Sequence, residues 1–581
     1  MNEFRFSPRP NRAAEINWMG WDEEAFERAR AEDKPILLAI SAVWCHWCHV
    51  MDETSYSDSE VIESINRNFV PIRVDNDRRP DVNARYNMGG WPTTAFLAPD
   101  GTTLTGATYL AAAHMRRALD EIARFYVERK GQIAERSAEL HAQIAEQPAQ
   151  PQGNLDDGPI RELIDQLERS FDDEYGGFGE APKFPQPEVH EFLLAEWRLS
   201  GEQRLYEMVA RTILAMARGG TYDHVEGGFF RYATTRDWSV PHFEKMAEDH
   251  AGLLRVLATL AIFAPTDEVH ATLTSAMGYV CRVLRDPRTG FFGGSQDADE
   301  EYYALPLQER QARERPFVDR TSYTNWTCAL AGAQFLVARA LDDDALLREA
   351  AETLDNVATR LVSEDGLLYH VLAPQGKPEV RGLLSDHAVY LRALLDAHEI
   401  SGEPRFLQRG RSIADVAIER FAAPGGGFYD RLVAVEAFGR LALPDRPIAE
   451  NGVMADSLLR LAALTGDEKY RQHAESVLRL YAPNVRAAGS FGATYARALR
   501  RYLLPETAVR VVGDPAATDE FRETALRLPM PFVTIRTLSP DDAALFAMPA
   551  ERAAYVCVTG TCGAPIRDPA ALRAAYEALA R

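Results

Sequence analysis

The spacing of apolar residues separates an alternating α/β segment from a long helical segment. In the first 145 residues, two stretches with helical periodicity alternate with short apolar runs of the kind that form buried strands. The helical stretches are 22–33 and 112–144, and the strand-like runs are 34–41, 69–75, 94–98 and 102–110. This order predicts an α/β domain over residues 1–145. Residues 146–156 lack periodicity and are rich in Pro, Gln and Asp, so they are predicted to be a linker.

Residues 157–505 are dominated by helical periodicity, and a turn that joins glycine to an aromatic or apolar residue recurs along them. Each interval is long enough for two helices of about 15 to 20 residues, as in 385–401 followed by 403–422. Six such hairpins predict a closed (α/α)6 toroid, and the alternative is an open helical solenoid with a more regular period. The turns begin at Gly176, Gly227, Gly290, Gly366, Gly426 and Gly489, which are 51, 63, 76, 60 and 63 residues apart.

The last part of the chain, residues 506–581, returns to a mixed pattern. Strand-like runs at 508–514, 531–537 and 553–560 alternate with helical stretches, which predicts a small α/β segment. The predicted fold class is therefore multidomain, with an α/β domain, an all-α (α/α)6 toroid and a small α/β C-terminal segment.

Composition narrows the possible partners. The 581 residues are 46% hydrophobic, enough to bury substantial cores, and 64 basic against 86 acidic side chains give a net charge of −22. This charge disfavours nucleic acid and anionic membrane surfaces as partners. The first residues contain no apolar core typical of a signal peptide, and no apolar run approaches the roughly 18 residues of a membrane span. We therefore expect a cytoplasmic protein without nucleic-acid or membrane partners.

The first candidate site is a pair of cysteines one helical turn apart. Cys45 and Cys48 follow the predicted strand 34–41. If a helix begins there, its free N–H groups and dipole stabilise a Cys45 thiolate, and Cys48 resolves the mixed disulfide. An imidazolium at either His46 or His49 could favour the thiolate further. The complete block reads Trp44, Cys45, His46, Trp47, Cys48, His49, and it is followed downstream by Trp91 and Pro92.

Three other interpretations of these cysteines remain open. The order C-x-x-C-H is the attachment pattern of c-type haem. The two cysteines with His46 and His49 could bind zinc or copper, although adjacent residues point apart. Two buried cysteines in a core helix are the structural alternative. The redox interpretation predicts a thiol–disulfide exchange partner or reductant, with no metal and no cofactor.

Motifs along nearly the whole chain resemble one family, the spermatogenesis-associated, YyaL-type thioredoxin-like proteins. The resemblance implies a thioredoxin-like domain, with a cis-proline at Pro92 beside the cysteines, fused to an (α/α)6 barrel similar to N-acylglucosamine 2-epimerase and six-hairpin glycosidases. Ala39 stands where thioredoxins place a buried, proton-transferring aspartate, so a histidine or water must move that proton here. The matching segments are 44–51, 89–101, 219–232, 238–251, 291–301, 382–391 and 555–569.

The second candidate site is a polar funnel at one end of the predicted toroid. Paired carboxylates and histidines near the glycine turns are suited to acid–base chemistry on a sugar, with aromatic rings to stack on it. The structural alternative is that these side chains cap helices or fill the core. The substrate-binding candidates are Tyr222, His242, Glu244, Asp297, Asp299, Asp386 and His387.

The remaining cysteines are ambiguous or structural. Cys557 and Cys562 could form a second redox or metal pair, or be buried thiols, while Cys281 and Cys328 are predicted to lie in the core. The leading hypothesis is a thiol–disulfide oxidoreductase coupled to a barrel that binds or modifies carbohydrate. The alternatives are a sugar epimerase or isomerase with a regulatory N-terminal domain, and a noncatalytic binding scaffold.

Overall fold

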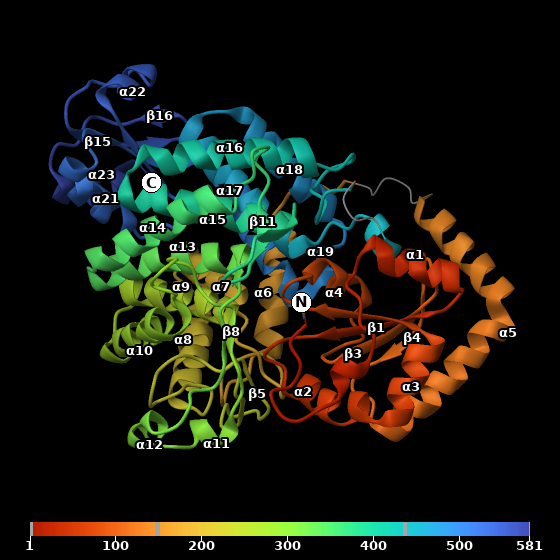
Figure 1. Ribbon diagram of the computed structural model, residues 1–581. Coiled ribbons are helices and arrows are strands. Elements are labelled where there is room, and N and C mark those ends of the chain that lie inside the picture. Colours follow the sequence, from red (N-terminus) through yellow and green to blue (C-terminus); the bar gives the residue numbers. More distant parts are fainter. Residues whose placement is uncertain (1–3, 146–151, 434–437, 580–581) are drawn as a thin grey trace. The chain divides into compact units, whose positions relative to one another are not determined.

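The computed structural model describes residues 4–145, 152–433 and 438–579, and they form two compact units (Figure 1). The first comprises Met1–Ala149 with Gln296–Asp299 and Arg431–Asp445, and the second comprises Gln150–Ser295, Glu300–Asp430 and Arg446–Arg581. Most of the predicted linker 146–156 lies outside the described residues, so its extent stays a prediction. None of the helices in the described ranges has the length and apolar composition needed to cross a membrane.

The first unit is built on a four-stranded sheet in the order β2-β1-β3-β4. The two central strands run antiparallel, β2 is parallel to β1, and β4 is antiparallel to β3. All four predicted strands are therefore confirmed. Their bounds are β1 Ile36–Ser41, β2 Val70–Asp75, β3 Thr93–Leu97 and β4 Thr103–Ala107.

Helices cover both faces of this sheet because β1 is apolar at every position but its last. Ile36, Leu38 and Ile40 point into a core shared with α1 and α4, whereas Leu37 and Ala39 point into a core shared with α2, α3 and α5. Successive strand residues face opposite ways, so a continuous apolar run fills both layers. The helices are α1 Glu23–Glu32, α2 His46–Glu53, α3 Ser59–Asn68, α4 Pro80–Tyr86 and α5 Ala112–Ala145.

The second unit contains a closed ring of six inner helices. Each inner helix contacts the next, and the last, α20, contacts the first, α7, which closes the ring. The predicted toroid is therefore confirmed over the open solenoid. The inner helices are α7 Pro187–Ser200, α9 Ala247–Phe263, α13 Thr324–Leu341, α15 Leu384–Ser401, α17 Ile448–Thr465 and α20 Ala493–Leu503.

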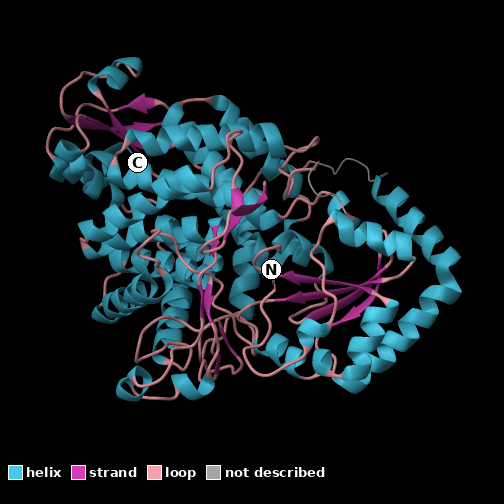
Figure 2. Cartoon of the chain, viewed as in Figure 1, coloured by secondary structure: helices cyan, strands magenta, loops and turns pink. Residues whose placement is uncertain are grey.

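An outer helix packs against each inner helix, so the ring has two layers. Figure 2 shows that helices make up most of this unit. Outer helices such as α8 bury one apolar stripe, whereas inner helices such as α15 are buried almost all round. The glycine turns between them all have positive φ, from 55° at Gly489 to 103° at Gly426. The outer helices are α6 Gly158–Ser170, α8 Gln203–Arg218, α10 Asp267–Tyr279, α14 Asp344–Arg360, α16 Pro404–Phe421 and α18 Glu468–Tyr481.

The C-terminal part of the second unit is a small sheet in the order β14-β13-β15-β16. Its β14 contacts α15 and α17, and residues 525–535 line one end of the ring. The strand predicted at 531–537 begins later, because Phe532 adopts a left-handed φ of 67° that breaks the extended backbone. The bounds are β13 Thr507–Val512, β14 Thr534–Leu538, β15 Ala553–Val558 and β16 Thr561–Cys562, with helices α21 Asp519–Leu526, α22 Pro540–Leu545 and α23 Leu572–Leu579.

Shorter elements connect these parts. They are η1 Ala13–Glu15, η2 Ser55–Ser57, β5 Tyr232–Ala233, β6 Pro241–His242, β7 Lys245–Met246, η3 Val280–Leu284, β8 Ser295–Gln296, α11 Glu300–Tyr303, α12 Leu307–Gln311, β9 Val318–Asp319, β10 Ser322–Tyr323, β11 Tyr369–Leu372, β12 Pro378–Arg381, η4 Gly439–Ala442, α19 Val485–Ala488, η5 Gly489–Gly492, η6 Ala516–Thr518 and η7 Pro569–Ala571.

Candidate functional site

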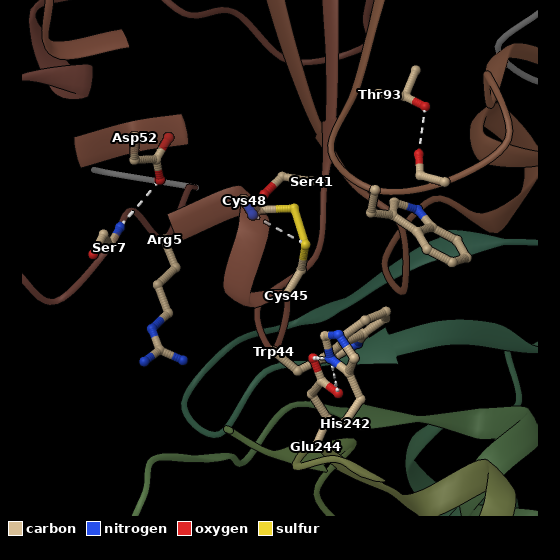
Figure 3. The surroundings of a disulfide bond; sticks show 12 residues. Arg5, Ser7, Ser41, Trp44, Cys45, Cys48, Asp52, Thr93, His242 and Glu244 are labelled. Carbon is tan, nitrogen blue, oxygen red and sulfur yellow. Dashed lines mark hydrogen bonds and ion pairs between the residues drawn. A yellow bond between two sulfur atoms is a disulfide. The ribbon is translucent and has the colours of Figure 1, made fainter. Parts of the chain in front are cut away.

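Cys45 is the N-terminal cap of α2, and it forms a disulfide with Cys48 (Figure 3). The backbone N–H of Cys48 donates to Cys45 Sγ over 3.2 Å, so the sulfur occupies the place that a capping oxygen takes in other helices. Unpaired N–H groups and the positive end of the helix dipole favour negative charge on that atom. Cys45 is only 4% exposed and Cys48 2%, so a partner must reach the sulfurs past closely packed side chains.

Aromatic side chains surround the pair. Trp44 is buried, its indole N–H donates to Asp77 Oδ2 over 2.7 Å, and its ring meets Trp91 edge to face at 5.7 Å. Trp47 points outward, is 48% exposed and packs on Tyr109. The two predicted tryptophans therefore differ, because one fixes the loop before α2 and the other presents a ring to solvent.

The loop that follows carries the predicted proline. The peptide bond between Trp91 and Pro92 is cis, as the family resemblance implies. Thr93, which begins β3, is fully buried; its hydroxyl donates to Gly90 O over 2.7 Å and accepts from Met88 N–H over 3.0 Å. These bonds fix the loop from both sides.

The two histidines of the block lie in different environments. His46 is exposed, whereas His49 is partly enclosed. Burial, followed by the charges of Arg5 and Arg73, lowers the pKa of His49 to about 4, so this imidazole is neutral at pH 7. The prediction that an imidazolium at either histidine stabilises the Cys45 thiolate is therefore wrong for His49. This side chain is neutral and can accept a proton.

The structure contains a buried ion pair one helical turn after Cys48, which the sequence analysis did not predict. Asp52 is fully buried on α2 and forms a bidentate pair with Arg73 of β2, with N···O distances of 2.7 and 3.0 Å. Arg73 also donates to Ser41 Oγ at the end of β1 over 3.3 Å. Only the spacing of four residues from Cys48 to Asp52 hinted that both lie on one helix face.

In the second unit, His242 and Glu244 form a pair before α9 begins. His242 Nδ1 lies 3.1 Å from both carboxylate oxygens of Glu244, and its ring stacks on Tyr232 at 4.7 Å. The hydrogen bond to Glu244 raises the pKa of His242. This pair has the composition expected of an acid–base site.

Two other predicted substrate-binding residues have structural roles. His387 is fully buried; its Nε2 accepts the N–H of Leu368 and its Nδ1 donates to Leu383 O over 2.7 Å. Tyr222 is 8% exposed and packs edge to face on Phe229 at 4.8 Å. Both side chains therefore fit the alternative interpretation, in which they cap helices or fill the core.

The three aspartates predicted to bind substrate lie on two different segments of the chain. Asp386 is fully buried in the first turn of α15, where it accepts from Asn325 N–H and lies 2.9 Å from His370 Nδ1. Asp297 belongs to the first unit and pairs with Arg5 at 3.0 Å, and Asp299 is an exposed residue of the same segment. Within the second unit, His242 and Glu244 bond to each other, whereas Asp386 and His387 bond to other partners.

A cavity of about 120 Å³ lies inside the ring, and none of those seven residues lines it. Below it, ion pairs cross the ring axis: Glu191 of α7 pairs with Arg392 of α15, the opposite member of the ring, and Arg255 pairs with Asp396 at 2.7 Å. This charged layer divides the axis, so the ring is not a pore. The walls above it include Glu188, Glu248, Asn325, Trp326 and Val453.

The carboxyls in these walls lie in the first turns of inner helices. Glu248 is an exposed residue, but the surrounding protein, then the charge of Glu188, raises the pKa of Glu248 to about 7. Asp249 follows Glu248 on α9 but does not line the cavity, and burial, then the charge of Glu248, raises its pKa to about 8. These values are near those needed to accept and return a proton at neutral pH.

The sequence held a signal for this cavity, in a short repeat. Residues 187–190 read PEVH and residues 247–250 read AEDH, each at the start of an inner helix. Glu188 and Glu248 hold the same place in the two copies. Aligning the helix starts, rather than the glycine turns alone, would have found both carboxyls.

The comparisons with known proteins concern the first part of the chain and the chain as a whole. Residues 9–145 match the family model Thioredox_DsbH, described as a protein of unknown function, DUF255. Human spermatogenesis-associated protein 20 is 26% identical, over 96% of this chain and 89% of its own length. The chain is thus similar to spermatogenesis-associated protein 20 along nearly its whole length. The resemblance found in the sequence is confirmed.

Two further matches concern single parts of this chain. The thiol:disulfide interchange protein TxlA of Synechococcus elongatus is 28% identical over 26% of this chain and 84% of its own length. A crystal structure of a sugar epimerase from a ruminal bacterium is similar with a TM-score of 0.49 and 13% identity, covering 60% of this chain and 98% of that one.

The other cysteines differ in pairing. Cys557 and Cys562 form a second disulfide, which corrects the expectation of buried thiols for this pair. Cys281 and Cys328 are free, and burial raises the pKa of both thiols. Among the described residues, no group of three or more histidine, cysteine or acidic side chains is arranged to hold a metal ion.

Proposed function

We propose that the first unit is a thiol–disulfide oxidoreductase in which Cys45 is the nucleophile and Cys48 the resolving cysteine. The observation that carries the proposal is the position of Cys45 Sγ as the cap of α2, accepting the N–H of Cys48. The similarity of this part of the chain to a thiol:disulfide interchange protein supports it.

The exchange proceeds in two steps. The Cys45 thiolate attacks a partner disulfide, forms a mixed disulfide and releases one partner thiolate. Cys48 then loses its proton and attacks Cys45 Sγ, which releases the second partner thiolate and restores the Cys45–Cys48 bond. Ala39 supplies no acid–base group, and His49, neutral and on the same helix, is the residue we assign to accept the Cys48 proton.

Single serine variants of the full chain test these roles. Each is reduced, treated with oxidised glutathione and analysed by mass spectrometry. Cys48→Ser should accumulate a glutathione adduct at Cys45, because the resolving step is lost, whereas Cys45→Ser should form none at Cys48 on the same timescale. Cys281→Ser, a free cysteine outside both pairs, is the matched control and should exchange as the wild type does. Equal adduct formation at Cys48 in Cys45→Ser would refute the assignment.

A second function, binding of a small polyol such as a sugar in the ring, is favoured by the carboxyls that line its cavity. The volume of about 120 Å³ holds about four waters and is below the range of roughly 300–1,000 Å³ usual for ligand sites. This volume holds only part of a sugar, so we propose that one edge of a single sugar ring enters it, with Glu248 as the group that exchanges protons and Trp326 as the stacking surface. His242 with Glu244 is the alternative acid–base pair for an epimerase or isomerase.

Calorimetric titration with free and N-acetylated monosaccharides tests this second function. We expect Glu248→Gln to weaken binding at least tenfold and to remove its dependence on pH near 7, because the titrating carboxyl is gone. Glu207→Gln on the outer helix α8 is the matched control. If no sugar binds the wild type, or if both variants bind equally well, the cavity has no such role.

A further inference from the structure

We propose that Cys557 and Cys562 form a second redox-active pair, in which Cys562 is the reactive thiolate and Cys557 the resolving cysteine. The two residues face each other across β15 and β16, next to a two-residue turn at Thr559 and Gly560. Figure 1 labels both strands in the blue, C-terminal part of the chain. Both turn residues have positive φ, 48° and 78°, as in a type I′ hairpin. The pair thus belongs to a locally specified hairpin.

The disulfide contributes little as a structural cross-link. It closes a loop with only four residues between the cysteines, and the gain from constraining an unfolded chain grows with loop length. Backbone bonds hold the same segment without it. Gly563 N–H donates to Val556 O over 2.9 Å, and Ala554 and Ile566 exchange hydrogen bonds of 2.8 and 2.9 Å. The two sulfurs therefore stay close when the bond is reduced, as a cycling pair requires.

The two sulfurs lie in different environments. Cys557 is 2% exposed in the small core that includes Val512, Leu538 and Tyr555, whereas Cys562 is partly exposed on the edge strand. An apolar environment disfavours a thiolate, and contact with solvent permits one. The asymmetry makes Cys562 the cysteine that a partner can reach.

A cation lies beside the accessible sulfur. Arg510 Nη1 approaches Cys562 Sγ at 3.9 Å, and its guanidinium lies over the ring of Phe546, 4.2 Å from the centroid. Arg536 lies over the same ring at 4.8 Å without a hydrogen bond to either sulfur. A fixed guanidinium stabilises a thiolate on Cys562, as a helix N-terminus does for Cys45.

The chemistry balances with a low-molecular-weight disulfide as oxidant. The Cys562 thiolate attacks one sulfur of R–S–S–R, breaks that bond, and forms Cys562–S–S–R with release of RS⁻. Cys557 then gives its proton to solvent and attacks Cys562 Sγ, which releases the second RS⁻. The protein pair loses two electrons and the small disulfide gains them.

The first experiment uses the full chain with Cys45→Ser and Cys48→Ser, so that its outcome is independent of the function proposed for the first unit. The protein is equilibrated with glutathione buffers of stepped redox ratio, quenched with acid and labelled with a maleimide mass tag. We expect the fraction of the Cys557–Cys562 disulfide to follow the ratio reversibly, with unchanged amide exchange in β15. A bond that opens only in denaturant, or whose reduction unfolds the hairpin, overturns the proposal.

The second experiment measures the thiolate directly. With Cys557→Ser added, the pH dependence of iodoacetamide alkylation at Cys562 should have a midpoint below the value of about 8.5 for free cysteine. Arg510→Gln should move that midpoint upward by about one pH unit, and Arg536→Gln, the matched control, should leave it in place. A midpoint at or above that of free cysteine, or one insensitive to Arg510→Gln, overturns the proposal.

Discussion

At the scale of single residues, two cations add to the effect of burial on the protonation of His49. Arg5 contributes the largest charge effect on this imidazole, ahead of Arg73, and both add to the effect of burial. A neutral His49 can accept a proton from Cys48, which a protonated imidazole cannot. The residues that matter for this chemistry therefore include two arginines far from the cysteines in sequence.

Neutralising Arg5 tests this electrostatic effect. We expect Arg5→Gln to raise the pKa of His49 by up to about one unit, because a nearby positive charge disfavours the imidazolium. The measurement is an NMR titration of the His49 ring Cε1–H signal. Arg9→Gln, which removes a largely exposed guanidinium, should shift the signal much less. An unchanged midpoint in Arg5→Gln would show that burial alone sets the pKa.

At the scale of elements, three of the six inner helices, α9, α15 and α17, share a tie, which is a hydrogen bond between their first turn and a glycine turn. His250, His387 and Asn451 each occupy the fourth position of an inner helix, and each accepts the backbone N–H of Phe229, Leu368 or Phe428 respectively. The repeated glycine turns predicted the hairpins because this tie recurs with them. The same tie explains why His387 is structural, which its position in the sequence alone could not reveal.

This tie makes the stability of the second unit depend on pH. Burial lowers the pKa of His250 to about 4, from an ordinary value of 6.5, so the unfolded chain binds this proton more readily. The contribution of neutral His250 to the free energy of unfolding is complete above pH 6.5 and is lost as the pH falls toward 4. At pH 5 the loss is about 2 kcal/mol.

The variant His250→Asn places the residue of the Asn451 site at this position and removes the titration. The difference in unfolding free energy between pH 7 and pH 5, from urea titrations, should be smaller in this variant than in the wild type by about 2 kcal/mol. His270→Asn, at a partly exposed histidine on α10, is the control and should leave the difference unchanged. An equal pH dependence in wild type and His250→Asn would contradict the role of the tie.

At the scale of the whole molecule, contacts between distant parts of the sequence close the ring. Glu196 on α7 and Arg500 on α20 form a bidentate pair with N···O distances of 2.8 and 2.7 Å. We expect Glu196→Gln to lower the unfolding free energy by about 2 kcal/mol, because it leaves a largely buried guanidinium without its partner. Urea denaturation of the full chain measures this loss.

The matched control is Glu202→Gln, an exposed carboxyl just before α8. A double-mutant cycle with Arg500→Gln isolates the pair, and a coupling energy near zero would mean that the ring closes without it.

Features that are local in the sequence could be predicted from it, whereas features that the whole molecule brings together could not. The disulfide of the first unit lies within four consecutive residues, and the strand before it is a plain apolar run, so both were found directly. The wall of the cavity combines residues from several helices, such as Glu188, Glu248 and Trp326, that only the closed ring brings together. The pairing of Cys557 with Cys562 depended on the register of a hairpin, which the turn at Thr559 and Gly560 sets.

The layer of ion pairs across the ring axis has a consequence for the shape of any ligand. Because Glu191, Arg392, Arg255 and Asp396 span the lumen, the cavity above them is a dead end. A polymer cannot thread through it, and a long molecule could insert only its terminal unit. Any reaction inside this ring would therefore act only on the free end of a polymeric ligand. The ligand would have to dissociate after each reaction before its next unit could enter.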